Sequence, residues 1–331
     1  MRTALHVAVF VLAVISPVIH AETHNFIPQH FYTTFAAHPP ALSIKPGDRV
    51  VTKTIDAGGV DWTGTKVTEK LSGPGGNPET GPFYIEGAEA GDMIVVTFEK
   101  IETNRAAANS GSLLAPYTVD PAAIATRTDR EPRRVTWTID KAHGVARLDA
   151  TDIQPGGIEL PLKPMLGCVG VAPERKQAIS TSYPGNFGGN MDYAGVVAGA
   201  KVMLPVNEPG ALLFIGDGHA RMGEGELVGS GLETSMDVEF KVDLVKKTAI
   251  AWPRLENDKY IMVLGSARPL DEALQHANSE MQRWLMADYG FTERGAQTFM
   301  GQAAELEIAN DVDPNFTVVT KIPKSLLSRH K

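Results

Sequence analysis

The chain has 331 residues, of which 43% are hydrophobic and 21% are charged, and its formal net charge is −8. That length suffices for a large buried core in one big domain or in two. The acidic balance argues against nucleic acids and anionic membranes as partners, because both carry negative charge themselves. Cys168 is the only cysteine. Its apolar surroundings predict a buried, inert thiol, and without a disulfide the stability must come from packing or a bound metal.

The first 21 residues have the pattern of a secretory signal peptide. Arg2 is the only charged residue among them, residues 4–19 are almost wholly apolar, and Ala21 offers a small side chain at the cleavage position. We therefore expect cleavage after Ala21, a periplasmic or secreted mature protein of residues 22–331, and no membrane contact after cleavage. The alternative is an uncleaved anchor, which the short apolar run and Pro17 disfavour.

The region from residue 41 to residue 264 is typical of short strands separated by turns. Its apolar or alternating segments are preceded by turns rich in Gly, Pro and Asp. We predict a β-rich α+β fold with a multi-stranded sandwich or barrel-like core. The intervals 70–80 and 103–118 are rich in small and polar residues, and we expect long loops there that overhang a site. The segments expected as strands are 50–55, 93–98, 201–206, 211–215 and 238–245.

Three segments of this region place a carboxylate among glycines or on a short strand. Asp56 stands at a strand end before two glycines, Glu86 lies in the apolar segment 81–87, and Asp192 closes the Gly- and Asn-rich loop 183–192. A carboxylate beside glycines is most often a turn former. Taken alone, Asp56 and Asp192 are therefore more typical of a structural role than of a chemical one.

The densest group of ionisable residues lies in the segment 216–226, which contains one His, one Asp and two Glu among four glycines. The apolar run before it predicts a buried strand that leads into a site loop. In an extended backbone Asp217 and His219 point to one side, as do Glu224 and Glu226. The glycines allow a small ligand to approach the main chain closely. The alternative is a solvated hairpin turn with scattered charges.

The C-terminal part changes its periodicity. Apolar residues recur at three- and four-residue spacing between Leu270 and Leu285, which predicts an amphipathic helix from Pro269 to about Asp288. A second helix is expected to begin at Thr292, whose hydroxyl can cap it. We interpret the apolar faces of both helices as core, within a helical segment that spans 265–310.

Taken in order, these segments resemble the acetamidase/formamidase family, whose members hydrolyse short-chain amides. The resemblance runs from about residue 40 to residue 330 and covers nearly the whole mature chain. It implies a β-rich fold with a helical C-terminal part, and a metal-assisted amidase activity on a small linear amide. The matching segments are 40–48, 81–88, 163–167, 170–173, the sequence Gly-Gly-Asn-Met-Asp at 188–192, and 216–226.

The resemblance also implies site residues for amide hydrolysis, which needs a polarised carbonyl, an activated water and a proton for the departing nitrogen. A divalent cation held by nitrogen and oxygen donors, zinc or a similar ion, can supply the first two. Several family members carry His directly before the Gly-Gly-Asn sequence, where this chain has Phe187. The candidates are Asp192, Asp217, His219 and Asp56 for the metal, Glu226 with Glu224 as fallback for proton transfer, and Asn190, Gly189 and Glu86 for the substrate.

Two other functions stay open at this point. The expected loops at 70–80 and 103–118 can reshape the pocket for a larger amide or a carbamate. A small-molecule or metal-binding protein without turnover is the second alternative. Phe187 is the residue that separates an enzyme from a binding protein, because a binding protein tolerates the loss of an imidazole that an enzyme needs. Assembly into a homo-oligomer is also open.

Overall fold

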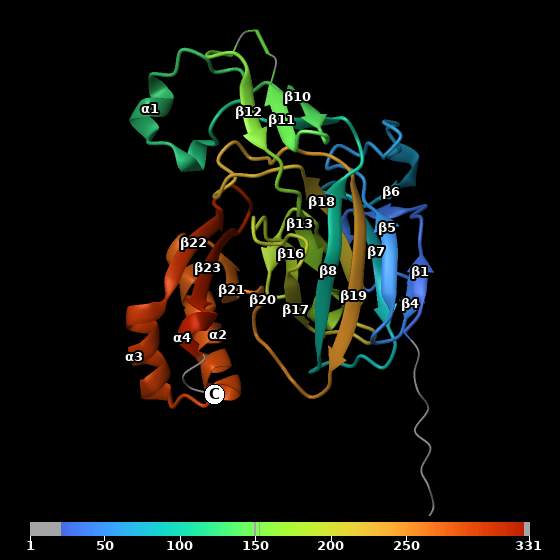
Figure 1. Cartoon of the computed structure of the whole chain (residues 1–331), viewed down its shortest axis with the longest axis vertical. Coiled ribbons are helices and arrows are strands. Elements are labelled where there is room, and N and C mark those ends of the chain that lie inside the picture. The colour runs from blue at the N-terminus through green and yellow to red at the C-terminus, as the bar shows by residue number, and fades with distance from the viewer. Residues whose placement is uncertain (1–20, 149, 152, 328–331) are drawn as a thin grey trace, which may run out of the picture.

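The computed structural model describes residues 21–148, 150–151 and 153–327, so the expected signal peptide lies outside the described residues except for Ala21. Strands make up most of the described secondary structure (Figure 1), which confirms the prediction of a β-rich fold. None of the helices in this part of the chain has the length and apolar character needed to span a bilayer.

The first large sheet contains the longest strands of the protein. Its order is β1-β5-β19-β8-β17-β20-β21-β23-β22, and β8 and β19 pair antiparallel near its middle. Alternate residues of β19 from Met236 to Val242 are buried while those between them are partly exposed, so one face of the sheet meets the core and the other meets solvent. The strands are β1 (Thr23–Asn25), β5 (Arg49–Lys53), β8 (Met93–Thr103), β17 (Lys201–Pro205), β19 (Met236–Val245), β20 (Arg254–Glu256), β21 (Tyr260–Ala267), β22 (Glu305–Asn310) and β23 (Phe316–Pro323).

The second large sheet carries the segments that the sequence singles out for chemistry. Its order is β15-β16-β13-β18-β7-β2-β6, with β4 paired to β7. Every residue of β13 and β18 is buried, so these strands are covered on both faces. The strands are β2 (Phe31–Tyr32), β4 (Leu42–Ile44), β6 (Leu71–Ser72), β7 (Glu79–Ile85), β13 (Met165–Gly170), β15 (Pro184–Gly185), β16 (Gly188–Asn190) and β18 (Leu213–His219).

The main hydrophobic core lies between these two sheets. The ring of Phe83 on β7 meets the ring of Phe240 on β19 edge to face at 5.2 Å between centroids. Phe98 on β8 packs in the same buried cluster as Leu166 on β13. Side chains from facing sheets thus interdigitate, and the predicted sandwich-like core is confirmed.

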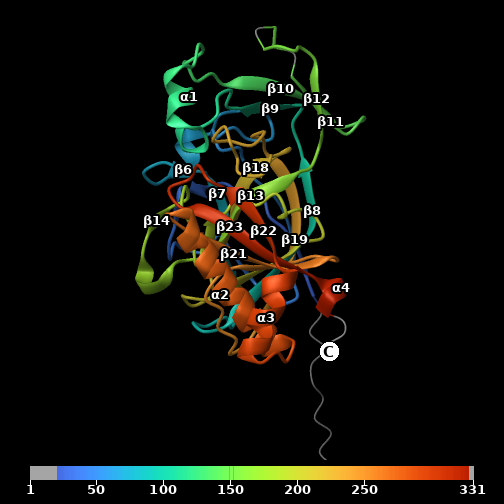
Figure 2. The ribbon, with the colours of Figure 1, turned by 90° about the vertical axis from the view of Figure 1, so that its left-hand side faces the viewer.

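Two helices cover the β21–β23 end of the first sheet (Figure 2), namely α2 (Leu270–Asp288) and α3 (Glu293–Ala303). Both were expected from the periodicity, and the Thr292 hydroxyl caps α3 by accepting a hydrogen bond from the Gly295 N–H at 3.1 Å. The helical segment ends earlier than expected. The chain returns to the sheet as the hairpin β22–β23 and closes with the single turn α4 (Lys324–Leu327).

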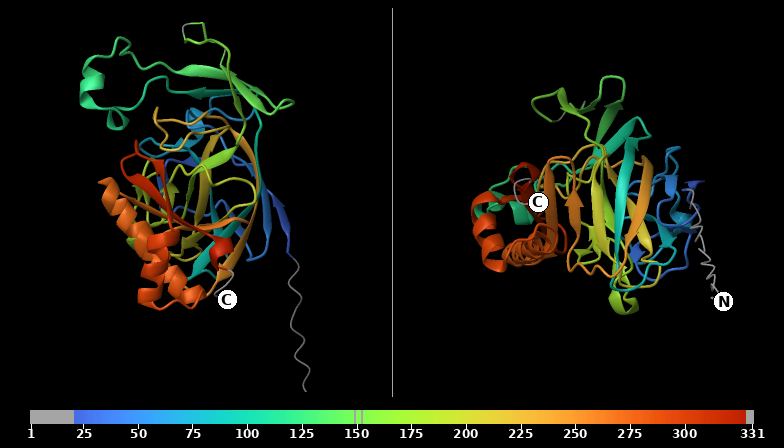
Figure 3. Two further views of the ribbon diagram at one scale, coloured as in Figure 1. Left: turned by 60° about the vertical axis from the view of Figure 1, so that its left-hand side comes forward. Right: turned by 60° about the horizontal axis from the view of Figure 1, so that its bottom comes forward.

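A smaller sheet with the order β12-β11-β10-β9 lies at the opposite end of the molecule from α3 (Figures 1 and 3). The short helix α1 (Pro121–Ala125) lies beside it. The strands are β9 (Ala107–Ser110), β10 (Val135–Asp140), β11 (Val145–Leu148) and β12 (Ile158–Pro161); β3 (Thr34–Phe35) and β14 (Ile179–Ser180) pair with each other, and η1 (Thr68–Lys70), η2 (Pro116–Thr118) and η3 (Glu174–Lys176) are 3-10 turns.

Candidate active site

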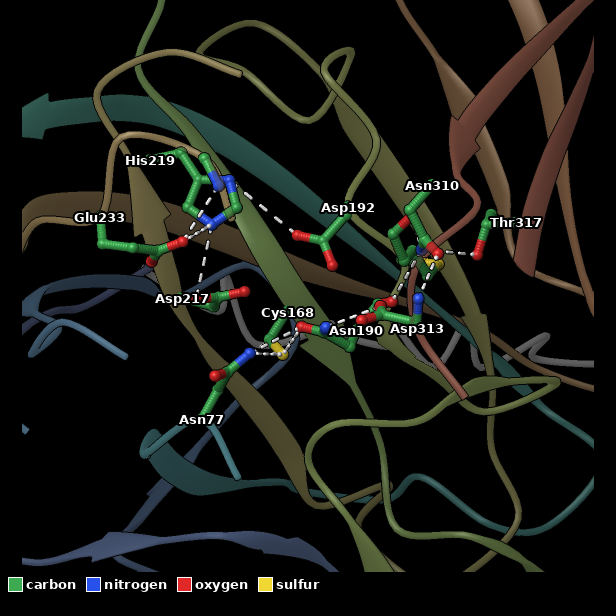
Figure 4. A network of polar contacts seen from close by, with 12 residues as sticks. Asn77, Cys168, Asn190, Asp192, Asp217, His219, Glu233, Asn310, Asp313 and Thr317 are labelled. Atoms are coloured by element: carbon green, nitrogen blue, oxygen red, sulfur yellow. Dashed lines mark hydrogen bonds and ion pairs between the residues drawn. The ribbon is translucent and has the colours of Figure 1, made fainter. Parts of the chain in front are cut away.

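A group of buried acidic side chains surrounds His219, the last residue of β18 (Figure 4). The Nδ1 atom of His219 lies 3.9 Å from Asp192 Oδ1, which confirms that these two residues lie close enough to share an ion. On the other edge of the ring, Nε2 lies 3.5 Å from Asp217 Oδ1 and 3.1 Å from Glu233 Oε1. We call Asp192, Asp217, His219, Glu226 and Glu233 the His219 cluster.

The cluster contains two sets of three residues that share the imidazole. The Asp192 triad comprises Asp192, His219 and Glu226, and the Asp217 triad comprises Asp217, His219 and Glu233. In each triad, one donor atom per residue lies within 4.8 Å of the others. Each set therefore has the compactness that a single metal ion requires.

Two glycines make this convergence sterically possible. A Cβ atom on Gly167 of β13 would lie 2.2 Å from Asp192 Oδ1 and 2.5 Å from Asp217 Oδ2. A Cβ atom on Gly231 would lie 2.5 Å from His219 Nδ1. Any larger residue at either position would thus collide with the cluster. The strand register also contributes. Met165 of β13 pairs with His219 of β18, so Gly167, two residues further along β13, lies next to the carboxylates of Asp192 and Asp217.

The backbone of the cluster adopts an unusual conformation. Asp192, Asp217 and Glu226 all have positive φ angles, of 42°, 54° and 51°. This left-handed region costs energy for residues other than glycine, and such residues gather at functional sites. The positive φ at Asp217 also shows that the segment 216–219 is not simply extended, although it continues β18.

Burial and mutual repulsion shift the pKa values of the cluster. Burial, followed by the negative charges of Glu226, Asp313 and Asp217, raises the pKa of Asp192 well above its usual range. Burial likewise raises the pKa of Glu226, against the opposing effect of His219. The pKa of Glu233 is raised to about 7, again by burial first. The site concentrates acidic groups where water cannot solvate them, so a cation there would relieve an electrostatic cost.

The donor atoms of the cluster fit a divalent metal ion. Both oxygens of Asp192, both nitrogens of His219, Oδ1 of Asp217 and Oε2 of Glu233 are buried without a hydrogen-bond partner among the described residues. Native proteins rarely leave so many buried polar atoms unsatisfied. One imidazole nitrogen with several carboxylate oxygens is a donor set that zinc and similar ions accept.

The cluster opens into a cavity of about 470 Å³. Asp217, Glu226 and Glu233 line it directly, whereas Asp192 and His219 lie behind them. Both segments expected as loops contribute to its wall, but the segment 103–118 is not simply a loop, because it contains strand β9, which carries the lining residues Asn109 and Ser110. The remaining lining residues are Ala57, Gly58, Asn77, Asn109, Ser110, Gly111, Pro132, Arg133, Arg134, Ser182, Asn190, Val228, Gly229, Ser230 and Asp313.

Asn190 is held in one orientation at the cavity wall (Figure 4). Its Oδ1 accepts hydrogen bonds from Cys168 Sγ at 2.7 Å and from Asn77 Nδ2 at 2.9 Å. Its Nδ2 donates to Asp313 Oδ2 at 2.8 Å. The thiol of Cys168 is fully buried, as expected, and burial raises its pKa well above the usual range. Cys168 thus supports Asn190 and does not line the cavity.

The C-terminal hairpin closes one side of the site. Asn310 at the end of β22 donates from Nδ2 to the backbone oxygens of Asn190 and Met191 at 3.4 and 3.3 Å. The Gly225 N–H donates to Ala309 O at 2.9 Å, which fixes the loop that carries Glu226. Residues far apart in sequence therefore hold the cluster together.

The structure places three expected site residues outside the cluster. The structure corrects the expectation that Asp56 is a metal ligand. The Asp56 carboxylate pairs with the Arg105 guanidinium and accepts a hydrogen bond from Val60 N at 2.9 Å, and Asp56 lies outside both triads. Glu86 is exposed just beyond the end of β7, and the glutamate that β7 brings near the site is Glu79 at its start. Gly189 is buried in β16 and does not line the cavity.

Glu224 and Glu226 do not point to the same side, contrary to expectation. Glu224 is exposed, whereas Glu226 is buried and lines the cavity. Gly225 and Glu226 both have positive φ angles, of 84° and 51°, so the backbone turns between the two carboxylates and the extended spacing rule does not apply. The structure therefore favours Glu226 over its fallback.

Phe187 lies in the hydrophobic core and not in the cavity. Its side chain is almost fully buried and packs against Phe35 at 5.4 Å between ring centroids. The residue that stands where several members of the acetamidase/formamidase family carry histidine thus lies outside both triads and outside the cavity lining. Phe187 therefore does not distinguish an enzyme from a binding protein in this chain.

Sequence reasoning missed four residues of the site. Glu233 is placed by backbone pairing with Asn109 and His219, which brings it from a later turn back to the cluster. Asp313 comes from the β22–β23 turn, and its pKa is raised to about 7 by burial. Asn77 comes from the segment before β7, and Glu79 is the first residue of β7. The turn-rich sequence 310–315 signals only that a turn is present, so no local pattern identifies these four residues.

Comparisons with known proteins agree with this geometry. The sequence pattern of the Acetamidase/Formamidase family matches residues 175–329, which include Asp192, the segment 216–226 and Asp313. A formamidase homologue of Schizosaccharomyces pombe is 27% identical over 264 residues, which is 63% of this chain and 62% of that protein. The match thus spans less than two thirds of the yeast protein.

Two solved structures match almost the whole chain. The acetamidase of Yersinia enterocolitica is 32% identical, with a TM-score of 0.79 and 95% of each chain covered. The predicted acetamidase/formamidase of Thermoanaerobacter tengcongensis is 28% identical, with a TM-score of 0.79, and covers 94% of this chain and 99% of its own. A shared fold, nearly complete mutual coverage and a matching site segment lead to one conclusion: this chain is a member of the acetamidase/formamidase family.

Proposed function

We propose that this protein is a metal-dependent amidohydrolase that cleaves the C–N bond of a small linear amide to a carboxylate and ammonia. The observation that carries the proposal is the His219 cluster, whose buried nitrogen and oxygen atoms face one another without hydrogen bonds beside a cavity. Family membership supports the reaction class. The names of the Yersinia and Thermoanaerobacter relatives describe acetamidase or formamidase activity for those proteins.

The Asp217 triad would hold the ion. Its carboxylates line the cavity, so an ion there would be within reach of a substrate. Asp192, expected as a ligand, would then orient the ring of His219 from the Nδ1 side, as carboxylates behind metal-bound histidines do. The Asp192 triad is the alternative ligand set, and it would make Glu226 a ligand. Zinc is the ion we propose, from the donor set.

When bound, a divalent cation at this site polarises the amide carbonyl and lowers the pKa of water. Glu226 faces the cavity beside the Asp217 triad and would accept the proton of the attacking water. A carboxyl group whose pKa is raised by burial can keep that proton and pass it to the departing nitrogen. Asn190, fixed by its three hydrogen bonds, would position the amide group.

The test is ammonia release by the purified protein from formamide, acetamide and propionamide, before and after dialysis against a chelator. We expect turnover of at least one amide, its loss after chelation and its recovery on addition of Zn²⁺. Full activity of a protein shown to be free of metal would contradict the metal dependence. A metal-loaded protein that binds amides without hydrolysing them would favour a binding function.

We also propose that the mature protein is periplasmic or secreted. The support is the N-terminal sequence, which combines Arg2, an apolar run and Ala21. Expression of the full-length gene product followed by cell fractionation tests this, with the mass of the exported form giving the cleavage position. Retention of the uncleaved chain in the membrane fraction would contradict it.

A further inference from the structure

The cavity is larger than a formamide or acetamide molecule requires. Its volume of about 470 Å³ exceeds many times the ~30 Å³ that one water molecule occupies in the liquid. Cavities of roughly 300 to 1,000 Å³ are the size that usually binds drug-sized ligands and cofactors. An amide of three or four heavy atoms would therefore leave most of this space to water.

Charge is distributed unevenly around the cavity. Asp217, Glu226 and Glu233 belong to the buried cluster, whereas Arg133 and Arg134 come from the segment just before β10, in the small sheet at one end of the molecule (Figure 1). An acidic chain thus presents two adjacent cations to the same cavity that its carboxylates line. Arg133 has a carboxylate neighbour, because it lies 3.7 Å from Asp129.

Arg134 is different from the other arginines of its segment. Arg127 donates from Nη2 to Leu114 O at 2.8 Å, and Arg130 donates from Nη2 to Ala125 O at 2.7 Å, so both hold the loop together. For Arg134, no carboxylate oxygen of the described residues lies within 4.0 Å, and no hydrogen bond to them is formed. Its guanidinium is a cation at the cavity wall whose hydrogen-bonding capacity remains available.

The position of this guanidinium is set by Gly58. A Cβ atom on Gly58 would lie 3.3 Å from both Nη atoms of Arg134, so the guanidinium lies directly against the glycine. Asp56, the nearest carboxylate on that loop, is already paired with Arg105. The Asp56-Ala57-Gly58 loop, expected to serve a metal, therefore forms a support for Arg134.

From these observations we infer that Arg134 forms a subsite for an anionic group, and that the preferred substrates are monoamides of short dicarboxylic acids. The inference rests on the proposed function and narrows its substrate class. A guanidinium can bind a carboxylate through two parallel hydrogen bonds. With its carboxylate held by Arg134, such a substrate has its neutral amide end left for the Asp217 triad and Glu226, which line the same cavity.

The first experiment compares succinamate and glutaramate with butanamide and pentanamide, neutral amides of the same chain lengths. We expect the parent protein to show a kcat/KM about 10- to 100-fold higher for the anionic amides, the usual scale for a hydrogen bond to a charged group. Arg134→Gln should remove this preference through KM and leave the neutral amides within about threefold. Raising the ionic strength should reduce the preference of the parent protein.

Two further variants sharpen the test. Arg294→Gln removes the same charge from an exposed position on α3, and it should leave the preference intact. Gly58→Ala needs no positive φ angle, but its methyl group would lie 3.2 Å from Asp56 Oδ1 and 3.3 Å from both Nη atoms of Arg134, so it should shift the guanidinium and raise KM for succinamate more than for butanamide. If the parent protein hydrolyses a neutral amide with the same kcat/KM as its anionic counterpart, the inference is overturned. An Arg134→Gln variant that loses activity equally on both classes would also overturn it.

Binding measurements separate this inference from the proposed function. If the metal-loaded protein hydrolyses none of these amides, the proposed function fails, and calorimetry with succinamate still tests the subsite. Tighter binding of succinamate than of butanamide, lost in Arg134→Gln, supports the subsite without turnover. Equal binding of the two amides, or equal binding by parent and variant, contradicts it.

Discussion

Glu224 and Glu226 are two residues apart in sequence, but only Glu226 faces the cavity. This difference provides a matched pair for testing the proton carrier. Glu226→Gln keeps the shape of the side chain and removes its titrating group. We expect this variant to fold, to retain its metal and to lose about two to four orders of magnitude in kcat, the usual scale for a general acid or base. Ammonia release and metal analysis provide the two readouts.

Glu224→Gln is the control, since Glu224 is exposed and outside both triads. It should keep near-parental turnover. If Glu226→Gln also loses the metal, Glu226 is a ligand and the Asp192 triad is the metal site. If Glu226→Gln stays active while Glu224→Gln does not, the two roles are exchanged.

His219 is the residue that the two triads share, so it has the largest predicted effect on metal content. His219→Ala removes the nitrogen donor from either ligand set, and we expect a folded protein with less than one tenth of the parental zinc after dialysis. Elemental analysis of the purified variant measures this. His143→Ala, at an exposed position in the turn after β10, should leave the zinc content unchanged. Parental zinc in His219→Ala would show that neither triad is the metal site.

Cys168 has a supporting role through Asn190. Cys168→Ala removes one hydrogen bond to Asn190 Oδ1, while the bond from Asn77 remains. We expect turnover within a few-fold of the parent protein, because the thiol does not line the cavity and its pKa is raised by burial. Steady-state kinetics with acetamide gives the comparison. Complete inactivation of the folded variant, with a trapped thioester in the parent, would instead indicate nucleophilic catalysis.

At the scale of the elements, the sequence predicts best what local periodicity determines. The helix from Leu270 to Asp288 follows from apolar spacing, and the cap at Thr292 follows from its hydroxyl. Strands such as β8 and β19 follow from alternation. The strand expected at 211–215 instead begins at Leu213 and continues to His219, because pairing with β13 extends the ladder through the glycines.

The sequence predicts the site only where its residues stand in recognisable motifs. Asp192, Asp217 and His219 stand in recognisable motifs, and their meeting was expected. Glu233 and Asp313 reach the cluster through strand pairing and a hairpin turn, and such long-range register leaves no local pattern. Asp56 failed as a metal ligand because Arg105, 49 residues away, neutralises it.

The docking of α2 on the first sheet depends on a buried ion pair. Glu280 is fully buried, and its Oε1 accepts hydrogen bonds from Arg254 Nε at 2.8 Å and Nη2 at 2.6 Å. Glu280→Ala leaves the Arg254 cation buried and unpaired, so we expect a loss of about 3–5 kcal/mol in the free energy of unfolding. Urea denaturation followed by circular dichroism measures it. Glu272→Ala, on the exposed face of α2, should cost less than about 0.5 kcal/mol.

At the scale of the whole molecule, the N-terminus of the expected mature chain is tied to the sandwich. The backbone N of Glu22 lies 2.8 Å from Oδ1 of Asp48, which is almost fully buried. Asp48 Oδ2 also contacts His24 Nε2 at 2.9 Å and accepts a hydrogen bond from Lys45 N at 2.9 Å. Burial alone would raise the pKa of Asp48, but these hydrogen bonds outweigh it and lower the pKa.

Cleavage after Ala21 would convert the Glu22 amide into a charged ammonium at the Asp48 carboxylate. We therefore compare the mature protein with a form that carries a few additional residues before Glu22. At pH 6 the free energy of unfolding of the mature protein should be higher by about 1–2 kcal/mol, the scale of a charge-assisted hydrogen bond. A carboxylate with a lowered pKa contributes stability above its ordinary pKa of ~3.9, and that contribution is lost as the pH falls through the lower folded value. The ammonium loses its charge above about pH 8, so the advantage should shrink there too.

Urea denaturation of both forms between pH 3 and pH 9 measures this difference in stability, with Asp48→Asn as the variant that removes the difference. Equal stability of the two forms at pH 6, or an exported protein whose mass places the cut elsewhere, would show that Asp48 does not receive a new N-terminus.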